Sequence, residues 1–270
     1  MFAILIIIVD IVVTMLGIYI FNYSVDGTIN VTLTIMLSLL AGIIITSLLV
    51  GLILEVFYLS LTKGKLQKSM FTHKLTKQII SVPIHFSRMR IKIVGKENLP
   101  LDPGFSIYVN HSSWIDFPII MYKLYDYPVA ALGKEGAFKL FLIGKFAPKF
   151  GCVMIHRQSP RHGAEAINQV INNVKDGFSM VIFPEGTRNP NVDTLLDFRH
   201  GAFKVALRSG KPLVPITIVK PKNYNNIKWP FKKRVTVVIH KPLLFDEFKT
   251  MKTPELSQRV KEIINSSLEK

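Results

Sequence analysis

The hydrophobic pattern divides the chain into two parts. Apolar residues run almost without interruption from 2 to 21 and again from 31 to 60, with a polar stretch at 22–30 between them. Each run is long enough to cross the hydrocarbon core of a bilayer as a helix. The sequence therefore predicts an N-terminal two-helix membrane segment over residues 1–62, followed by a second domain over residues 63–270.

The flanking charges predict how this segment is oriented. Lysines at 63, 65, 68, 74 and 77 follow the second apolar run directly. By the positive-inside rule this end, and the domain after it, face the cytoplasm at the cell membrane. A cleaved signal peptide is a weaker alternative for the first run, which lacks a basic start and a small-residue cleavage site. A helical hairpin that enters only one leaflet is a second alternative, and Asp10 within the first run favours it.

After residue 68 the pattern changes to short apolar runs that alternate with amphipathic stretches. The apolar runs predict strands at 90–95, 105–109, 128–132, 152–156, 179–183, 213–219 and 234–240. The amphipathic stretches predict helices at 115–124, 135–147, 161–174, 201–209 and 254–268. Strands that alternate with helices of this length predict an α/β domain, in which helices flank a mixed, largely parallel sheet.

The charge of the second domain restricts its partners. All 34 lysines and arginines lie from residue 63 onward with 15 of the 18 acidic residues, a formal net charge of +19 there. Such a charge suits nucleic acid or anionic lipid headgroups, and the adjoining apolar segment favours lipid. Interleaved stacking aromatics and a recognition helix, which nucleic-acid binding calls for, are not apparent, so we expect no nucleic-acid partner. A single cysteine, Cys152, excludes an internal disulfide.

A candidate acid–base pair follows the second predicted strand. The strand runs into Asn110 and His111, and Asp116 lies five residues after the histidine. At the carboxyl end of a strand, such a carboxylate can orient the imidazole and stabilise its protonated form while the other ring nitrogen takes a proton. The spacing alone also fits a histidine and a helix-capping aspartate that never meet. Ser112 and Ser113 are better explained as turn residues than as nucleophiles.

A candidate phosphate-binding turn follows the predicted strand 179–183. Its residues are Pro184-Glu185-Gly186-Thr187-Arg188. Arg188 offers a forked cationic contact, Thr187 a hydroxyl, and Gly186 a close approach of the backbone. Glu185 would hold the arginine or bind a ligand hydroxyl. A surface turn with a solvated ion pair is the plain structural alternative.

Together these motifs resemble the glycerolipid acyltransferase family, which includes the 1-acylglycerol-3-phosphate acyltransferases. The resemblance covers about residues 105–220 in order and spacing. The residues that match the family's motifs are Asn110, His111 and Asp116 for the first, 151–157 ending in Arg157 for the second, 183–188 for the third, 198–202 for its continuation, and 214–216 around Pro215 for the fourth.

The resemblance implies direct acyl transfer without a covalent acyl-enzyme. His111, oriented by Asp116, would deprotonate the free hydroxyl of 1-acylglycerol-3-phosphate, which attacks the thioester of acyl-CoA or acyl-carrier protein and gives phosphatidic acid. By the same resemblance, the glycerol phosphate would be bound by five residues: Arg157, Glu185, Gly186, Thr187 and Arg188. Pro215 would shape the acyl or acceptor site. No Gly-x-Ser-x-Gly elbow of a serine hydrolase occurs in the sequence.

Other interpretations keep part of this picture. The same chemistry on another lysophospholipid or an amino-acid lipid, or acyl exchange between phospholipids, changes only the acceptor. A non-catalytic, membrane-bound lipid-binding protein is a remote alternative from another class. We expect no metal and no bound cofactor, since the histidines lack ligand spacing. The expected partners are lysophospholipid and acyl thioester substrates, a bilayer with anionic lipids, and acyl-carrier protein as one candidate donor.

Overall fold

The chain divides into two compact units, Met1–Lys63 and Gly64–Lys270. The computed structural model describes residues 11–12, 15–16, 19, 36, 39–47, 50, 53, 73, 77–78, 80–81, 84–138, 146–155, 160–227 and 231–269. In the first unit residues 39–47 form a helix. Within the described residues, no helix has both the length and the hydrophobicity to cross a membrane. Most of the predicted membrane segment, residues 1–62, lies outside the described residues.

The second unit is an α/β domain built on a seven-stranded sheet. The strands are β1 (Met89–Val94), β2 (Ser106–Val109), β3 (Val129–Lys134), β4 (Val153–Ile155), β5 (Ser179–Ile182), β6 (Leu213–Val219) and β7 (Lys233–Ile239). Their order across the sheet is β1-β7-β6-β2-β5-β3-β4. All neighbouring pairs are parallel except β6 and β7, which are antiparallel. The prediction of a mixed, largely parallel sheet is confirmed.

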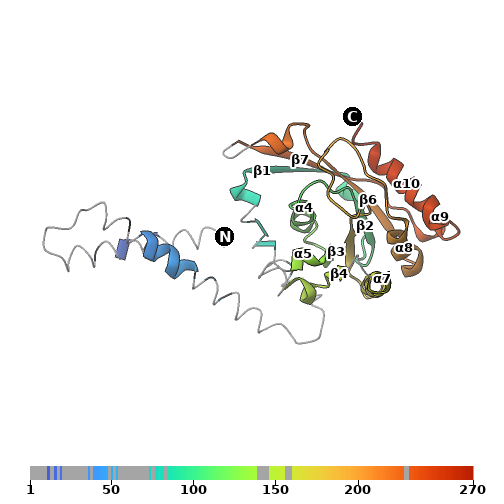
Figure 1. Ribbon diagram of the computed structural model, residues 1–270, viewed down its shortest axis with the longest axis horizontal. Helices are drawn as coiled ribbons and strands as arrows, with labels where there is room; N and C mark the ends of the chain where they lie inside the picture. The colour runs from blue at the N-terminus through green and yellow to red at the C-terminus, as the bar shows by residue number, and fades with distance from the viewer. Residues whose placement is uncertain are drawn as a thin grey trace. The chain divides into compact units, whose positions relative to one another are not determined.

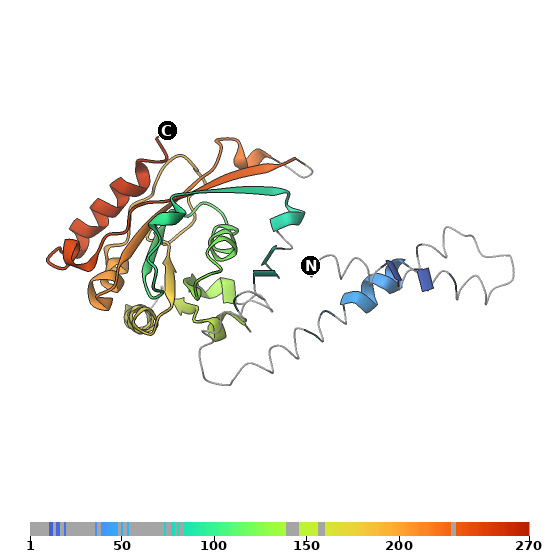
Figure 2. The same ribbon diagram turned by 180° about the vertical axis from the view of Figure 1, so that it is seen from behind.

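Helices cover both faces of this sheet. They are α4 (Asp116–Lys123), α5 (Glu135–Phe138), α7 (Pro160–Lys175), α8 (Lys204–Ser209), α9 (Phe245–Phe248) and α10 (Thr253–Asn265), with 3-10 turns at Lys96–Asn98, Ala147–Phe150, His200–Phe203 and Tyr224–Asn226. In both views α4 lies on one side of the sheet and α8 and α10 on the other (Figures 1 and 2). The predicted helix 135–147 begins as α5, and residues 139–145 lie outside the described ones.

The central strands form the core because their side chains are covered on both faces. Every residue of β2 and β5 is buried, as parallel strands between two helical layers require. The Tyr108 ring of β2 stacks on Phe203 at 4.5 Å between centroids, and its hydroxyl donates to the Ala202 carbonyl at 2.9 Å. The segment 198–202 thus packs against the centre of the sheet.

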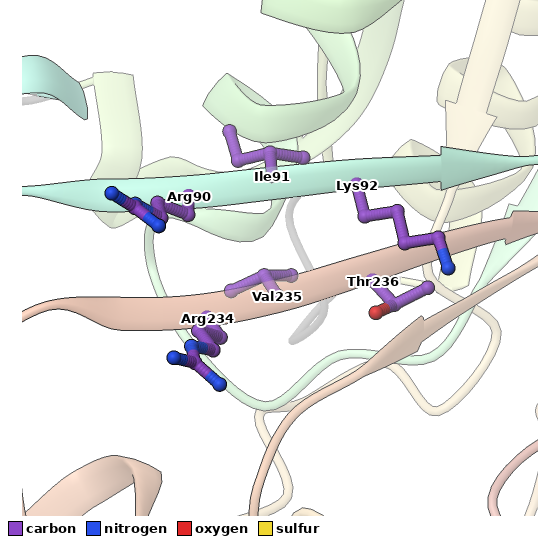
Figure 3. A pocket seen from close by; sticks show the side chains of 6 residues that line it. All are labelled: Arg90, Ile91, Lys92, Arg234, Val235 and Thr236. Carbon is purple, nitrogen blue, oxygen red and sulfur yellow. The ribbon is translucent and has the colours of Figure 1, made fainter.

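The outer strands β1 and β7 have one apolar face and one exposed face. Ile91 and Val235 pack against the core, whereas Arg90, Lys92 and Arg234 are exposed to solvent (Figure 3). In the parallel register Arg90 lies opposite Arg234. These three exposed residues, Arg90, Lys92 and Arg234, are called the basic strip below.

Candidate active site

The first part of the site is the turn between β2 and α4. Strand β2 ends at Val109 and α4 begins at Asp116, so the intervening residues bring the aspartate back toward His111. The Asp116 Oδ2 atom lies 3.0 Å from His111 Nδ1. It also accepts the backbone N–H of Ser112 at 2.8 Å and of Ser113 at 2.7 Å. The two residues predicted to pair therefore do meet, and the carboxylate closes the turn as well.

His111 is placed so that one ring nitrogen can act on a ligand. When Nδ1–H donates to Asp116, Nε2 is left as the basic nitrogen. The imidazole stacks on the Phe183 ring with centroids 4.1 Å apart and 26° between the planes. The His111 side chain is 19% exposed, so the ring is fixed on one face and still reachable from outside.

Asp116 is fully buried yet ionised. Burial acts to raise its pKa, but the hydrogen bond from His111, the positive charge of Lys220 and the backbone N–H of Ser113 outweigh burial and hold the pKa below the ordinary carboxyl value. The Lys220 Nζ group donates to the second carboxylate oxygen, Oδ1. The aspartate is therefore a negative charge available to a protonated imidazole.

The loop after β5 is fastened to the His111 turn by Glu185. Only 3% of Glu185 is exposed, and its carboxylate accepts the His111 backbone N–H at 2.7 Å and the Leu196 N–H at 2.9 Å. Burial raises the pKa of this carboxyl, against the opposing effect of these two backbone bonds. In the opposite direction, the Asn189 N–H donates to the His111 carbonyl at 2.7 Å. The loop after β5 is thus joined to the His111 turn by two hydrogen bonds, one from Glu185 before Arg188 and one from Asn189 after it.

The predicted phosphate-binding residues lie in this fastened loop. Gly186 adopts φ 72°, a left-handed conformation that suits glycine, and its N–H donates to the Phe183 carbonyl at 3.0 Å. Thr187 and Arg188 are exposed. Arg188 directly precedes Asn189, whose N–H bonds the His111 carbonyl. The arginine is therefore held close to the turn that carries the imidazole.

The other predicted residues are placed less directly. Arg157 lies outside the described residues, which end at Ile155 in β4 and resume at Pro160. Pro215 is buried in β6, where it pairs with Tyr108 of β2. Tyr108 lies three residues before His111 in the chain. Its role in shaping a substrate site stays a prediction. Within the described part of the chain no group of His, Cys, Asp or Glu is suited to holding a metal ion.

Comparison with known proteins places the chain in a family. Residues 90–219 match the family model described as Acyltransferase. A 1-acyl-sn-glycerol-3-phosphate acyltransferase of Bacillus subtilis is 31% identical over 184 residues, which cover 65% of this chain and 88% of that protein. The chain belongs to the 1-acyl-sn-glycerol-3-phosphate acyltransferase family. The family member of Borreliella burgdorferi is 29% identical over 175 residues, covering 65% of this chain and 69% of its own.

A solved acyltransferase structure shares the fold. The crystal structure of the 1-acyl-sn-glycerophosphate acyltransferase from Thermotoga maritima superposes with a TM-score of 0.62 at 22% identity, over 82% of this chain and 88% of that one. The agreement extends to the arrangement of sheet and helices. The resemblance stated from the motifs is confirmed.

One polar residue beside the His111–Asp116 pair was not recognised from the sequence, and the contacts of another were not predicted. Lys220 follows β6 directly and is buried against Asp116. Asn110, matched from the sequence to the first family motif without an assigned contact, donates through its amide nitrogen to the Ile218 carbonyl at 3.1 Å and accepts the Ile218 N–H at 2.7 Å through its amide oxygen. The sequence signal that could have indicated a role for Lys220 is its position, because it directly follows the seven largely apolar residues of a predicted strand.

Proposed function

We propose that this acyltransferase moves a fatty acyl group from an acyl thioester to the free hydroxyl of 1-acylglycerol-3-phosphate and thereby forms phosphatidic acid. The observation that carries the proposal is the His111–Asp116 pair at the carboxyl edge of the sheet, in which the His111 ring is partly exposed and the turn is joined to the loop that holds Arg188. The relatives named for this reaction support the choice of acceptor.

The pair supplies a general base for this reaction. The Asp116 carboxylate accepts from Nδ1 and stabilises the imidazolium that forms when Nε2 removes the proton from the acceptor hydroxyl. The hydroxyl oxygen then attacks the thioester carbonyl. As the tetrahedral intermediate collapses, the C–S bond breaks and the thiolate takes the proton from His111, so no group of the protein is acylated.

The loop after β5 is proposed to bind the glycerol phosphate. The exposed Arg188 guanidinium and Thr187 hydroxyl supply charged and neutral donors for phosphate oxygens, and the Gly186 backbone allows close approach. Arg157 would add a second cation. Glu185, also predicted to bind the glycerol phosphate, has a carboxylate that accepts two backbone N–H groups, and we propose that it supports the site by holding the loop in place.

The enzyme is proposed to work at a bilayer that contains anionic lipids, on its cytoplasmic face. The 39–47 helix exposes apolar side chains, with Leu40 at 54% and Ile43 at 55%, which favours contact with lipid. On the catalytic domain, the basic strip places Arg90 opposite Arg234. Like charges in that position repel each other, so anionic headgroups would relieve an unfavourable contact.

Acyl transfer with purified components tests the proposal. The full chain in detergent micelles is offered labelled acyl-CoA or acyl-carrier protein with a panel of lysolipids, and His111→Ala is run in parallel. Lysophosphatidic acid should be acylated by the wild type, and the variant should lose at least about a hundredfold in rate. Transfer to another lysophospholipid alone would keep the mechanism and change the acceptor. Equal rates for a folded variant and the wild type on every acceptor would contradict an acyltransferase function.

A further inference from the structure

Lys220 occupies a buried position beside the reacting pair. It follows β6, which runs parallel to β2, so its side chain starts from the same sheet edge as His111. The Lys220 side chain is 0% exposed. A lysine is almost never buried this completely unless its charge is compensated, so its partners indicate what it does.

Three partners surround the Lys220 ammonium group. Its Nζ donates to Asp116 Oδ1 and to Ser112 Oγ at 2.8 Å. It also lies over the Tyr224 ring, 4.9 Å from the centroid, within the range of a cation–π contact. A carboxylate, a hydroxyl and an aromatic face therefore surround a group that has three donors.

The two carboxylate oxygens of Asp116 have different partners. Oδ2 accepts from His111 and from the backbone of Ser112 and Ser113, whereas Oδ1 accepts from Lys220. Contacts to both oxygens fix the rotation of the carboxyl group. They also mean that the charge of Asp116 is shared between the Lys220 ammonium and any imidazolium at His111.

We propose that Lys220 is a positioning residue of the acyl-transfer site, which holds the Asp116 carboxylate in place and limits how strongly that carboxylate stabilises protonated His111. The proposal rests on the proposed function for its catalytic consequence, and on the contacts alone for its effect on the histidine. A base that is too strongly stabilised in its protonated form is inactive at neutral pH, so a neighbouring cation keeps His111 available.

The other charged and titratable groups that face Lys220 or His111 remain in place when Lys220 is changed. They are Asp116 from α4, Glu185 from the loop after β5, Tyr224 from the 3-10 turn after β6, and Lys233 from β7. Lys233 provides the matched control, because its Nζ lies over the same Tyr224 ring at 4.7 Å on the partly exposed start of β7.

The test replaces the cation with an unbranched apolar side chain, Lys220→Met, beside Lys233→Met. Removing the Lys220 charge leaves Asp116 to stabilise the imidazolium alone. The His111 resonance, assigned by its loss in His111→Ala, should titrate about one pH unit higher in Lys220→Met, a tenfold change in proton affinity. Lys233→Met should shift it by less than about a third of that. This NMR titration needs no substrate, so it stays informative even if the proposed function fails.

Kinetics give the second reading. The acidic limb of kcat/KM against pH should move upward by the same amount in Lys220→Met, so that kcat is lower than in the wild type on the acidic side of the profile and recovers toward pH 9. The KM for the lysolipid should change less than about twofold. An unchanged His111 titration in a folded Lys220→Met, or a loss of kcat that follows only the folded fraction, would reduce Lys220 to a structural residue.

A second variant protects the test against failure to fold. Lys220→Gln keeps a donor for Asp116 Oδ1 and removes the charge, so it should fold and show the same upward shift. Lys220→Arg keeps the charge and should restore the wild-type pH profile where it folds. A Lys220→Gln enzyme with the wild-type titration would show that charge is not what Lys220 contributes.

Discussion

Asp116 receives four hydrogen bonds, from His111, the backbone of Ser112 and Ser113, and Lys220. At the scale of single residues this arrangement serves two purposes. It orients His111, the proposed general base, and it closes the turn through which β2 enters α4. In the proposed mechanism, stability and catalysis therefore depend on the same carboxylate, and we expect substitutions at Asp116 to affect both.

Asp116→Asn separates the charge of this residue from its shape. Because the folded-state pKa of Asp116 is lowered, its ionisation stabilises the fold at neutral pH. This stabilisation is lost as the pH falls below the ordinary value of about 3.9 and through the lower folded-state pKa. The variant leaves Lys220 buried without a carboxylate, so its free energy of unfolding at pH 7 should be lower by about 3–5 kcal/mol.

Urea unfolding of both proteins between pH 3 and pH 7 measures this difference. The gap between wild type and Asp116→Asn should narrow below about pH 3.9, because there the unfolded wild-type chain takes up a proton on Asp116 that the folded protein binds less readily. Glu185, with its raised pKa, contributes with the opposite sign but is present in both proteins. A gap that stays constant across the range would mean that the Asp116 charge does not stabilise the fold.

Arg188→Ala should weaken acceptor binding selectively. The exposed guanidinium is proposed to contact the phosphate, and loss of a charge-assisted pair costs about 1.5–3 kcal/mol, so the KM for lysophosphatidic acid should rise roughly tenfold or more. The KM for the acyl donor should change little. Arg208→Ala on α8, where the arginine bonds Asn168 at 3.3 Å, is the control and should match the wild type. An unchanged acceptor KM would exclude Arg188 from this role.

The residue scale is also where the sequence predicted least. His111 and Asp116 stand five positions apart in one turn, so their contact followed from local spacing. Lys220 reaches Asp116 across 104 positions of the chain, and no periodic pattern reports which polar residue at a strand end turns inward. The same limit applies to Glu185, whose partners are backbone N–H groups that carry no sequence signal.

At the scale of elements the predictions held well. Each of the seven predicted strands lies within two residues of an observed one, because apolar runs bounded by glycine, proline or charge are strong signals. The order of the strands in the sheet was not predicted. The position of β7 between β1 and β6, antiparallel to β6, depends on packing of the whole sheet.

The end of β1 offers a test of how tightly these strands are packed. Gly95 has φ +79°, and a Cβ atom there would lie 2.2 Å from the Ile239 carbonyl oxygen of β7. Gly95→Ala should therefore lower the free energy of unfolding by about 2–4 kcal/mol, seen as a lower urea midpoint. Gly136→Ala, where a Cβ meets nothing within 4 Å, is the control. Equal midpoints would mean that the β1 end yields without cost.

At the scale of the whole molecule, the proposed function assigns contact with lipid to two features, the basic strip of the second unit and the exposed apolar side chains of the 39–47 helix. The basic strip contributes three of the cations of a strongly basic domain. Near an anionic surface each lysine or arginine contributes about 1 kcal/mol. The effect falls off within a Debye length of about 10 Å at 0.1 M salt.

Co-sedimentation of the full chain with vesicles tests the basic strip. Arg90→Gln with Arg234→Gln should lower binding to vesicles that contain anionic lipid by about tenfold or more at low salt. The difference should disappear at about 1 M salt, where screening acts within 3 Å. Arg259→Gln, whose arginine pairs with Glu247 on the far helices, should behave as wild type. Equal binding by the double variant would move the lipid contact elsewhere.

The hydrogen bonds that join the loop after β5, proposed to bind phosphate, to the His111 turn constrain how this enzyme could diversify. Glu185 and Asn189 hold the loop to the turn through hydrogen bonds to the backbone of His111, so insertions between them would displace both His111 and the proposed phosphate-binding residues. The side chains of Thr187 and Arg188 project from the loop and are exposed. A lineage that acquires a new acceptor would therefore change the side chains at these two positions and keep the length of the loop.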